Sequence, residues 1–265
     1  MALGLGPYVA GMNRAAAIVL SVTAAVVLVA GAGAWWFLRD DAPEEVDLSA
    51  ATAGVAESGA SQDGADGSTD AAGDGGTFDS DASGTWNVDT DTGEFDYESA
   101  TGTFAGFRIA EELAGIGSTT AVGRTGDVSG TMEIDGETVT SANFEVDLTT
   151  ITTDDSRRDD KVQDALDTSS FPTASFTLTE PIELGSAAST GEPVSVSAIG
   201  DLTINGVTTQ VGFPLDAQVV DGTVVVVGSL DIAFSDYDVE VPSSPIVVSV
   251  DDNGTLELQL LLTKN

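Results

Sequence analysis

The chain has 265 residues, no cysteine, no histidine, and 44 acidic against 8 basic residues, which gives a formal net charge of −36. This composition excludes disulfides, Cys–His and Ser–His–Asp catalytic arrangements, and histidine-ligated metal sites. It also argues against a nucleic-acid partner, because nucleic-acid binding needs clusters of Lys and Arg to neutralise phosphates. No P-loop, nucleophile elbow or dinucleotide fingerprint occurs, so we expect no enzyme activity and no cofactor.

A membrane-spanning helix is predicted at residues 15–38, after a short tail over 1–14. The segment has no charged residue, and an arginine stands on each side of it. At about 1.5 Å per residue, such a helix crosses a hydrocarbon core of about 30 Å. The aromatic run at 35–37 resembles an interfacial belt. We expect a signal-anchor with the C-terminal domain outside the cytoplasm; cleavage after an A-x-A site at 32–34, which would secrete the protein, is the alternative.

Residues 39–84 are predicted to be an acidic, disordered linker. The segment is rich in Ala, Gly, Ser, Asp and Glu, and Phe78 is its one aromatic residue. Such a composition buries too little apolar surface to offset the entropy of ordering the chain. We expect it to act as a flexible spacer between the anchor and a folded domain at 85–265.

The 85–265 domain shows apolar residues at every second position, which is typical of strands with one buried face. The polar residues between them are expected to face water. Asn205-Gly206 and Asp221-Gly222 join alternating runs and favour type I′ hairpins. The runs are Val128–Ile134, Ala142–Leu148, Val194–Ile204, Val211–Val219, Val224–Phe234 and Leu256–Leu262.

One segment, residues 154–166, departs from this alternation and predicts a short helix. It begins with two aspartates, of which Asp154 or Asp155 is the expected N-cap. Many strands joined by hairpins, with one helix, favour a closed antiparallel barrel, because closure removes exposed sheet edges. The predicted fold is therefore an all-β, lipocalin-like barrel of about eight strands, which is wide enough to hold one small ligand.

Several motifs, in order, resemble the YceI-like family of barrels. They are the opening Trp86–Asp89 strand, Val128–Met132, Ala142–Leu148 with Arg157–Asp159, the Phe171–Phe176 step and the Gly200–Thr208 hairpin. The resemblance spans nearly all of 85–265 and implies an apolar cavity that holds a polyisoprenoid or a similar amphiphile. The sequence departs from the family pattern at Asn205, where many relatives carry histidine.

The predicted ligand site is the barrel interior. Small residues with inward parity, such as Ala142, Ala198, Gly200, Ala217 and Gly228, would leave space there, unless larger residues on facing strands fill it. An apolar lining suits a lipid. The expected lining is Phe144, Val146, Leu148, Ile204, Phe213, Leu215, Leu230 and Leu258.

Arg157 and Arg158 are the candidate contacts for an anionic headgroup, through their planar guanidinium groups. The alternative is local pairing with neighbouring aspartates at helical spacings. Residues 87–98 only partly imitate a calcium loop, because the glycine is displaced by one position, so no metal site is expected.

The sequence therefore predicts a non-enzymatic lipid carrier that stores, shields or transports an isoprenoid outside the cytoplasm. Its partners would be that lipid and, through residues 15–38, the membrane; homodimerisation stays open. The main alternative is a filled acidic barrel that binds a basic protein or an envelope component. A third alternative is an enzyme that uses carboxylates alone.

Overall fold

The computed structural model describes residues 42–62, 82–113, 117–186, 190–241, 247–250 and 252–264. The predicted tail at 1–14 and membrane helix at 15–38 lie outside the described residues. Among the helices that are described, none combines the length and the apolar character needed to cross a membrane.

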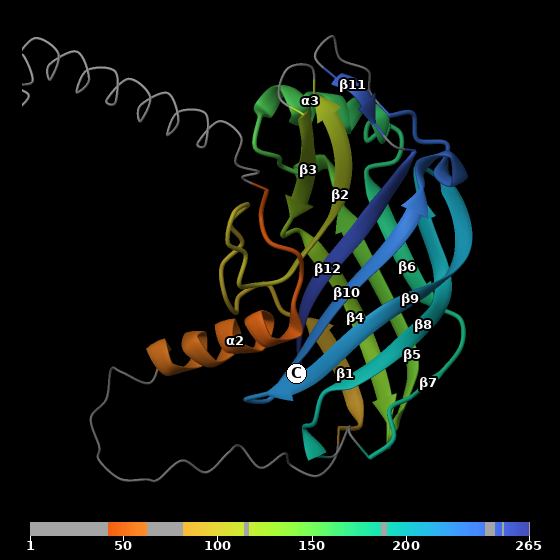
Figure 1. Ribbon diagram of the computed structural model, residues 1–265. Coiled ribbons are helices and arrows are strands. Elements are labelled where there is room, and N and C mark those ends of the chain that lie inside the picture. Colours follow the sequence, from red (N-terminus) through yellow and green to blue (C-terminus); the bar gives the residue numbers. More distant parts are fainter. Residues whose placement is uncertain are drawn as a thin grey trace, which may run out of the picture. The chain divides into compact units, whose positions relative to one another are not determined.

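Eight antiparallel strands close into a barrel (Figure 1), which confirms the predicted fold class. Each strand pairs with the next in the ring, and the last, β12, pairs back onto β1 through Trp86 and Lys264. In ring order they are β1 (Gly84–Val88), β4 (Val128–Asp135), β5 (Thr138–Asp147), β6 (Thr173–Leu178), β8 (Val194–Ile204), β9 (Val207–Val220), β10 (Thr223–Ala233) and β12 (Asn253–Lys264).

Four further strands extend this ring. The β2 (Phe104–Leu113) and β3 (Gly117–Thr125) strands form a hairpin, β11 (Val247–Val250) pairs with β2, and the short β7 (Ile182–Glu183) pairs with β5. Strands β1 and β2 share one edge of β12, because β1 pairs with residues 262–264 and β2 with residues 255–259. The outer wall at β12 is therefore broad and continuous with the β2–β3 hairpin.

Both predicted hairpin turns are present, between β8 and β9 and between β9 and β10. Asn205 and Gly206 have φ angles of 50° and 73°, and Asp221 and Gly222 have 50° and 82°. Positive φ at both central residues is the requirement of a type I′ turn, whose twist matches that of the flanking strands.

The predicted short helix is α3 (Ser156–Ala165), and it lies at one end of the barrel (Figure 1). Asp155 is its N-cap, since the carboxylate accepts a hydrogen bond from the amide of Arg157. In the part of the chain that the structure describes, 3₁₀ turns occur at η2 (Leu148–Thr150) after β5 and at η3 (Phe234–Tyr237) after β10.

A second helix, α2 (Leu48–Gln62), corrects the expectation that the whole of 39–84 is disordered. Ala51 and Val55, four residues apart on one helix face, are 3% and 4% exposed. They pack against Val225 and Val227 of β10 and Leu261 of β12. Helix formation here depends on this contact with the barrel, because an isolated helix of this length is marginal in water.

The outer face of the β10–β12 wall is therefore buried, and not only the inner face (Figure 1). Val225 and Leu261 alternate with Val224, Val226, Leu260 and Leu262, which belong to the interior cluster. The expectation that residues between the inward positions face water is wrong for this wall. Its continuous apolar sequence is that of a strand covered on both sides.

Candidate functional site

The barrel encloses an apolar cavity of about 180 Å³. Residues from every strand of the ring except β1 contribute to it, together with Phe107 of β2 and Leu166 after α3. Seven of the eight predicted lining residues lie on its surface: Phe144, Val146, Leu148, Ile204, Phe213, Leu215 and Leu258. Leu230 does not; it packs against the neighbouring cluster of Leu202, Ile204 and Tyr237.

Of the five small inward residues, Ala217 packs against the interior cluster without lining the cavity, and the other four divide into two groups. Ala142 and Ala198 line the cavity, as predicted. Gly200 and Gly228 do not leave space, because a Cβ at Gly200 would lie 2.4 Å from the Phe176 ring and one at Gly228 would lie 2.5 Å from Leu215. Large side chains from neighbouring strands fill the space at those two positions. The alternative interpretation, in which large residues fill the interior, is therefore correct there.

Aromatic rings form part of the cavity lining. Phe176 and Phe213 pack edge to face with their centroids 6.4 Å apart, and Phe144 is paired with Phe176 across β5 and β6. Edge-to-face packing is a favoured geometry for aromatic pairs. These three rings all border the cavity, so their rotamers determine its free volume.

Polar groups are scarce on the cavity surface. Among the described residues that line it, the polar side chains are those of Ser175 and Glu257. Glu257 stands between Leu256 and Leu258, which share the inward parity of β12. Its carboxylate is directed to two arginines on β2 and β3. The interior thus offers a ligand almost nothing except hydrocarbon contact.

A buried ion-pair cluster lies behind this part of the wall. Glu257 accepts hydrogen bonds from Arg108 Nε at 2.5 Å and from Arg124 Nη2 at 3.3 Å. The side chains of Glu257, Arg124 and Arg108 are only 1%, 4% and 11% exposed. Arg124 also lies over the Phe104 ring, 4.5 Å from its centroid. Burial lowers the pKa of Arg124, and the Glu257 carboxylate opposes this shift by favouring the charged form.

The segment before α2 completes the cluster. The carbonyl of Pro43 accepts a hydrogen bond from Arg108 Nη2, and the carbonyl of Glu44 accepts one from Arg124 Nη2 at 2.7 Å. Residues 42–47 therefore cover the guanidinium groups, and α2 continues the cover over β10 and β12. We call residues 42–62 the N-terminal strap.

Sequence reasoning missed this cluster. The available signal was Glu257 inside an otherwise apolar β12 run, together with Arg108 and Arg124 inside strand segments. A charge embedded in an apolar run needs a partner when it is buried. The alternation rule assigned Glu257 to solvent because the strap that covers it could not be foreseen.

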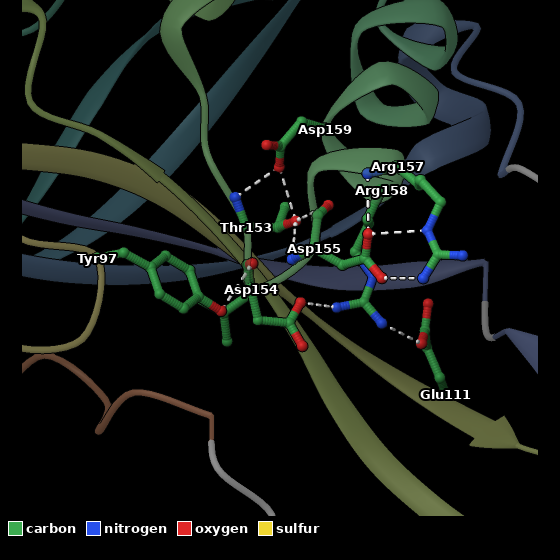
Figure 2. Close-up of polar contacts among 9 residues, drawn as sticks. Tyr97, Glu111, Thr153, Asp154, Asp155, Arg157, Arg158 and Asp159 are labelled. Carbon is green, nitrogen blue, oxygen red and sulfur yellow. Dashed lines mark hydrogen bonds and ion pairs between the residues drawn. The ribbon is translucent and has the colours of Figure 1, made fainter.

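Arg157 and Arg158 lie at the start of α3 (Figure 2). Neither is among the residues that line the cavity. Arg157 is 87% exposed and binds both carboxylate oxygens of Asp155 through Nε and Nη2 at 3.2 and 2.9 Å. This side-chain bond, helped by the capping bond from the Arg157 amide, lowers the pKa of Asp155 to about 2. Arg157 is thus already paired within the helix N-terminus.

Arg158 is held by two carboxylates, as Figure 2 shows. Its guanidinium bonds to Asp154 and lies 3.6 Å from Glu111 of β2. Asp159 accepts from the amide and hydroxyl of Thr153, which fixes the approach to the helix. The geometry favours the local-pairing interpretation of this basic cluster over a headgroup contact.

The partial calcium-loop motif forms an ordered turn. Asp89 accepts hydrogen bonds from the amides of Asp91 and Thr92 and from the Thr92 hydroxyl. These bonds are those of an Asx turn, so the Asp89 carboxylate has a local structural role. In the described part of the chain, no group of three or more acidic side chains has the geometry to hold a metal ion.

A closed antiparallel barrel around an apolar interior is the architecture of the lipocalin-like binding proteins. The family model described as YceI-like domain matches residues 76–262, so the chain belongs to the YceI-like family. The N-terminal strap lies outside the matched region. A search of curated proteins finds no match.

Solved structures with this fold include a polyisoprenoid binding domain from Saccharophagus degradans implicated in plant cell wall breakdown. It is 17% identical, with a TM-score of 0.51, over 68% of this chain and 98% of that one. Burkholderia cenocepacia BcnA is 20% identical and has a TM-score of 0.48; the match covers 66% of this chain and 98% of BcnA. The Campylobacter jejuni YceI protein is 18% identical and has a TM-score of 0.44; the match covers 54% of this chain and 85% of that protein.

Proposed function

We propose that this protein binds a polyisoprenoid or a similar amphiphilic lipid in the barrel interior and does not transform it. The observation that carries the proposal is the enclosed cavity, whose described lining is hydrocarbon apart from Ser175 and Glu257. Family membership supports it, as does the fold shared with the Saccharophagus degradans domain, whose name describes polyisoprenoid binding.

Burial of apolar surface would provide the affinity. Each Å² of hydrocarbon removed from water contributes about 25 cal/mol, so a chain contacting several strands binds without any polar anchor. The cavity of about 180 Å³ is smaller than common ligand pockets of roughly 300–1,000 Å³. A long lipid therefore requires side chains to move, and the Phe144, Phe176 and Phe213 rings are placed to do so.

Filling the cavity is expected to abolish most lipid binding. In Ala142→Leu, the new side chain occupies space that the lipid needs, and overpacking of about 1–3 kcal/mol corresponds to a loss of roughly 5- to 150-fold in affinity. The matched control is Ala217→Leu, the same change at a partly buried residue outside the lining. Native mass spectrometry of the full chain, with organic extraction of the bound lipid, measures both.

Equal lipid content in wild type and Ala142→Leu, with both folded by circular dichroism, would contradict the assignment of the cavity as the lipid site. A wild-type protein that retains no lipid and takes up none on addition would contradict the proposed function itself. That result would favour the filled acidic barrel that binds another macromolecule.

We also propose that the barrel acts outside the cytoplasm, held at a membrane by residues 15–38. Support comes from the uncharged 24-residue length of that segment and its aromatic end. The full chain is expected to stay in the membrane pellet after alkaline washing, whereas a variant lacking residues 1–41 is released. A full chain recovered as a shorter soluble protein that begins after Ala34 would replace the anchor with the secreted form.

A further inference from the structure

We propose that the cavity selects an uncharged isoprenoid, such as a polyprenol or a quinone, and discriminates against the phosphorylated forms. This inference rests on the proposed function and names its ligand class. It follows from where the structure places the basic side chains of the described residues, 42–62, 82–113, 117–186, 190–241, 247–250 and 252–264.

The part of the chain that the structure describes contains six basic residues: Arg108, Arg124, Arg157, Arg158, Lys161 and Lys264. None of them is among the described residues that line the cavity. Arg108 and Arg124 are buried against Glu257 and covered by the strap carbonyls. A phosphate could reach them only by displacing a carboxylate that is itself buried.

The arginines at the α3 end of the barrel are already paired with carboxylates. Arg157 is paired with Asp155, and Arg158 is paired with Asp154 and lies near Glu111. Each guanidinium therefore has at least one carboxylate in place of a phosphate. The neighbouring carboxylate charges offset the positive charge of each guanidinium and weaken its attraction for an incoming anion.

An acidic groove runs beside α3 at the same end. Asp164 and Asp167 line it from α3 and the turn that follows, and Asp238 and Glu240 line it from the chain after η3. Lys161 is the basic residue among its described lining. Four carboxylates against one ammonium give a local negative field, which repels a phosphate that emerges at this end.

The sixth basic residue, Lys264, lies at the end of β12 that pairs with β1. Its ammonium lies over the Trp86 ring, 5.2 Å from the centroid. Neither Lys264 nor Trp86 lines the cavity. Trp86 is 5% exposed and belongs to the interior cluster. The ammonium is thus engaged with the face of a buried ring and is not directed at the ligand space.

The two ligand forms therefore meet different environments. A hydroxyl or quinone head is neutral, so its desolvation in the apolar interior costs far less than that of a charged phosphate. A phosphate head is either buried without a cation or held in the acidic field at the α3 end. The hydrocarbon chain gains the same burial in both cases, so the difference in affinity arises from the headgroup alone.

The test is competition between a long-chain polyprenol and the monophosphate of the same chain, for the full-length protein in one uncharged detergent. Native mass spectrometry reports the bound ratio at equal micellar concentrations. We expect the polyprenol to be preferred at least about tenfold. Burying a charged group without a partner lowers the affinity by at least that factor. Equal or stronger binding of the monophosphate would overturn this inference and leave lipid binding intact; binding of neither would refute the proposed function.

A designed cation provides a second measurement. Leu166 lines the cavity next to α3 and is only partly buried, so Leu166→Arg can place a guanidinium at that end. The variant is expected to shift the ratio toward the monophosphate by roughly tenfold, whereas the neutral control Leu166→Gln leaves the preference for polyprenol. An unchanged ratio in Leu166→Arg, with polyprenol still bound, would show that the missing cation is not what sets the preference.

Discussion

Replacing Glu257 by alanine is expected to lower the free energy of unfolding by about 3–5 kcal/mol, the usual cost of removing one partner from a buried ion pair. Glu257 is the shared acceptor for Arg108 and Arg124, and its side chain is 1% exposed. Without it, two guanidinium groups stay at a low-dielectric position with no carboxylate between them. Urea unfolding of the full chain, followed by circular dichroism, measures the loss.

The matched control is Glu145→Ala, which removes an exposed carboxylate from the outer face of β5. It is expected to change stability by less than about 0.5 kcal/mol. A triple variant, Arg108→Met with Glu257→Leu and Arg124→Met, removes the whole charged cluster and should recover most of the loss. A Glu257→Ala protein as stable as wild type would mean that this cluster does not stabilise the wall.

Placing a charge on the inner face of α2 is expected to detach the strap. In Val55→Asp, a carboxylate would lie against Val225, Val227 and Leu261 with no partner, which is unfavourable for the docked helix. We expect the free energy of unfolding to fall by about 2 kcal/mol. The helix can undock, so the loss cannot exceed the free energy of its contact with the barrel. Hydrogen exchange of the α2 amides, together with urea unfolding, measures the change.

Ala56→Asp is the control, because Ala56 follows Val55 on the exposed face of the same helix. It adds the same negative charge and lowers helix propensity more than Val55→Asp does, so it is a stringent control, and it should leave the α2 amides protected. If Val55→Asp retained wild-type protection, the contact between α2 and the barrel wall would be absent in solution. Loss of protection in both variants would assign the effect to helix propensity and not to docking.

The strap also affects how the domain should be produced. The matched family region begins at residue 76, and a fragment that starts there lacks residues 42–62. Such a fragment would expose Val225, Val227 and Leu261 and uncover the guanidinium groups of Arg108 and Arg124. The chain from Ala42 onward is one compact unit, and it is the natural boundary for the barrel.

Much of the barrel could be predicted from local patterns. Asn205-Gly206 and Asp221-Gly222 adopt positive φ at both central residues, as their hairpin positions require. Asp155 caps α3, as an aspartate before a short helix should. Alternation identified seven of the eight predicted lining residues, because the period of a strand fixes which side chains point inward.

Long-range packing decided the rest. Leu230 has the inward parity but packs on the Tyr237 cluster, because η3 covers that part of β10. Gly200 and Gly228 leave no space, because Phe176 and Leu215 from neighbouring strands fill it. Periodicity gives the face of a strand, whereas the volume on that face depends on side chains distant in sequence.

The sequence by itself determined the strands, the turns, the helix cap and the apolar character of the interior, because each depends on residues within a few positions of one another. Only the tertiary structure showed that Glu257 is buried between two arginines and that residues 48–62 form a helix. Both depend on contacts between residues far apart in the chain. The strap and the β2–β3 hairpin are 65 and 80 residues apart at their hydrogen bonds, and Glu257 is more than 100 residues from both arginines. The contacts of α2 with β10 and β12 are also long-range. No local pattern encodes such contacts, since the same acidic, alanine-rich stretch stays disordered when no apolar wall is available to it.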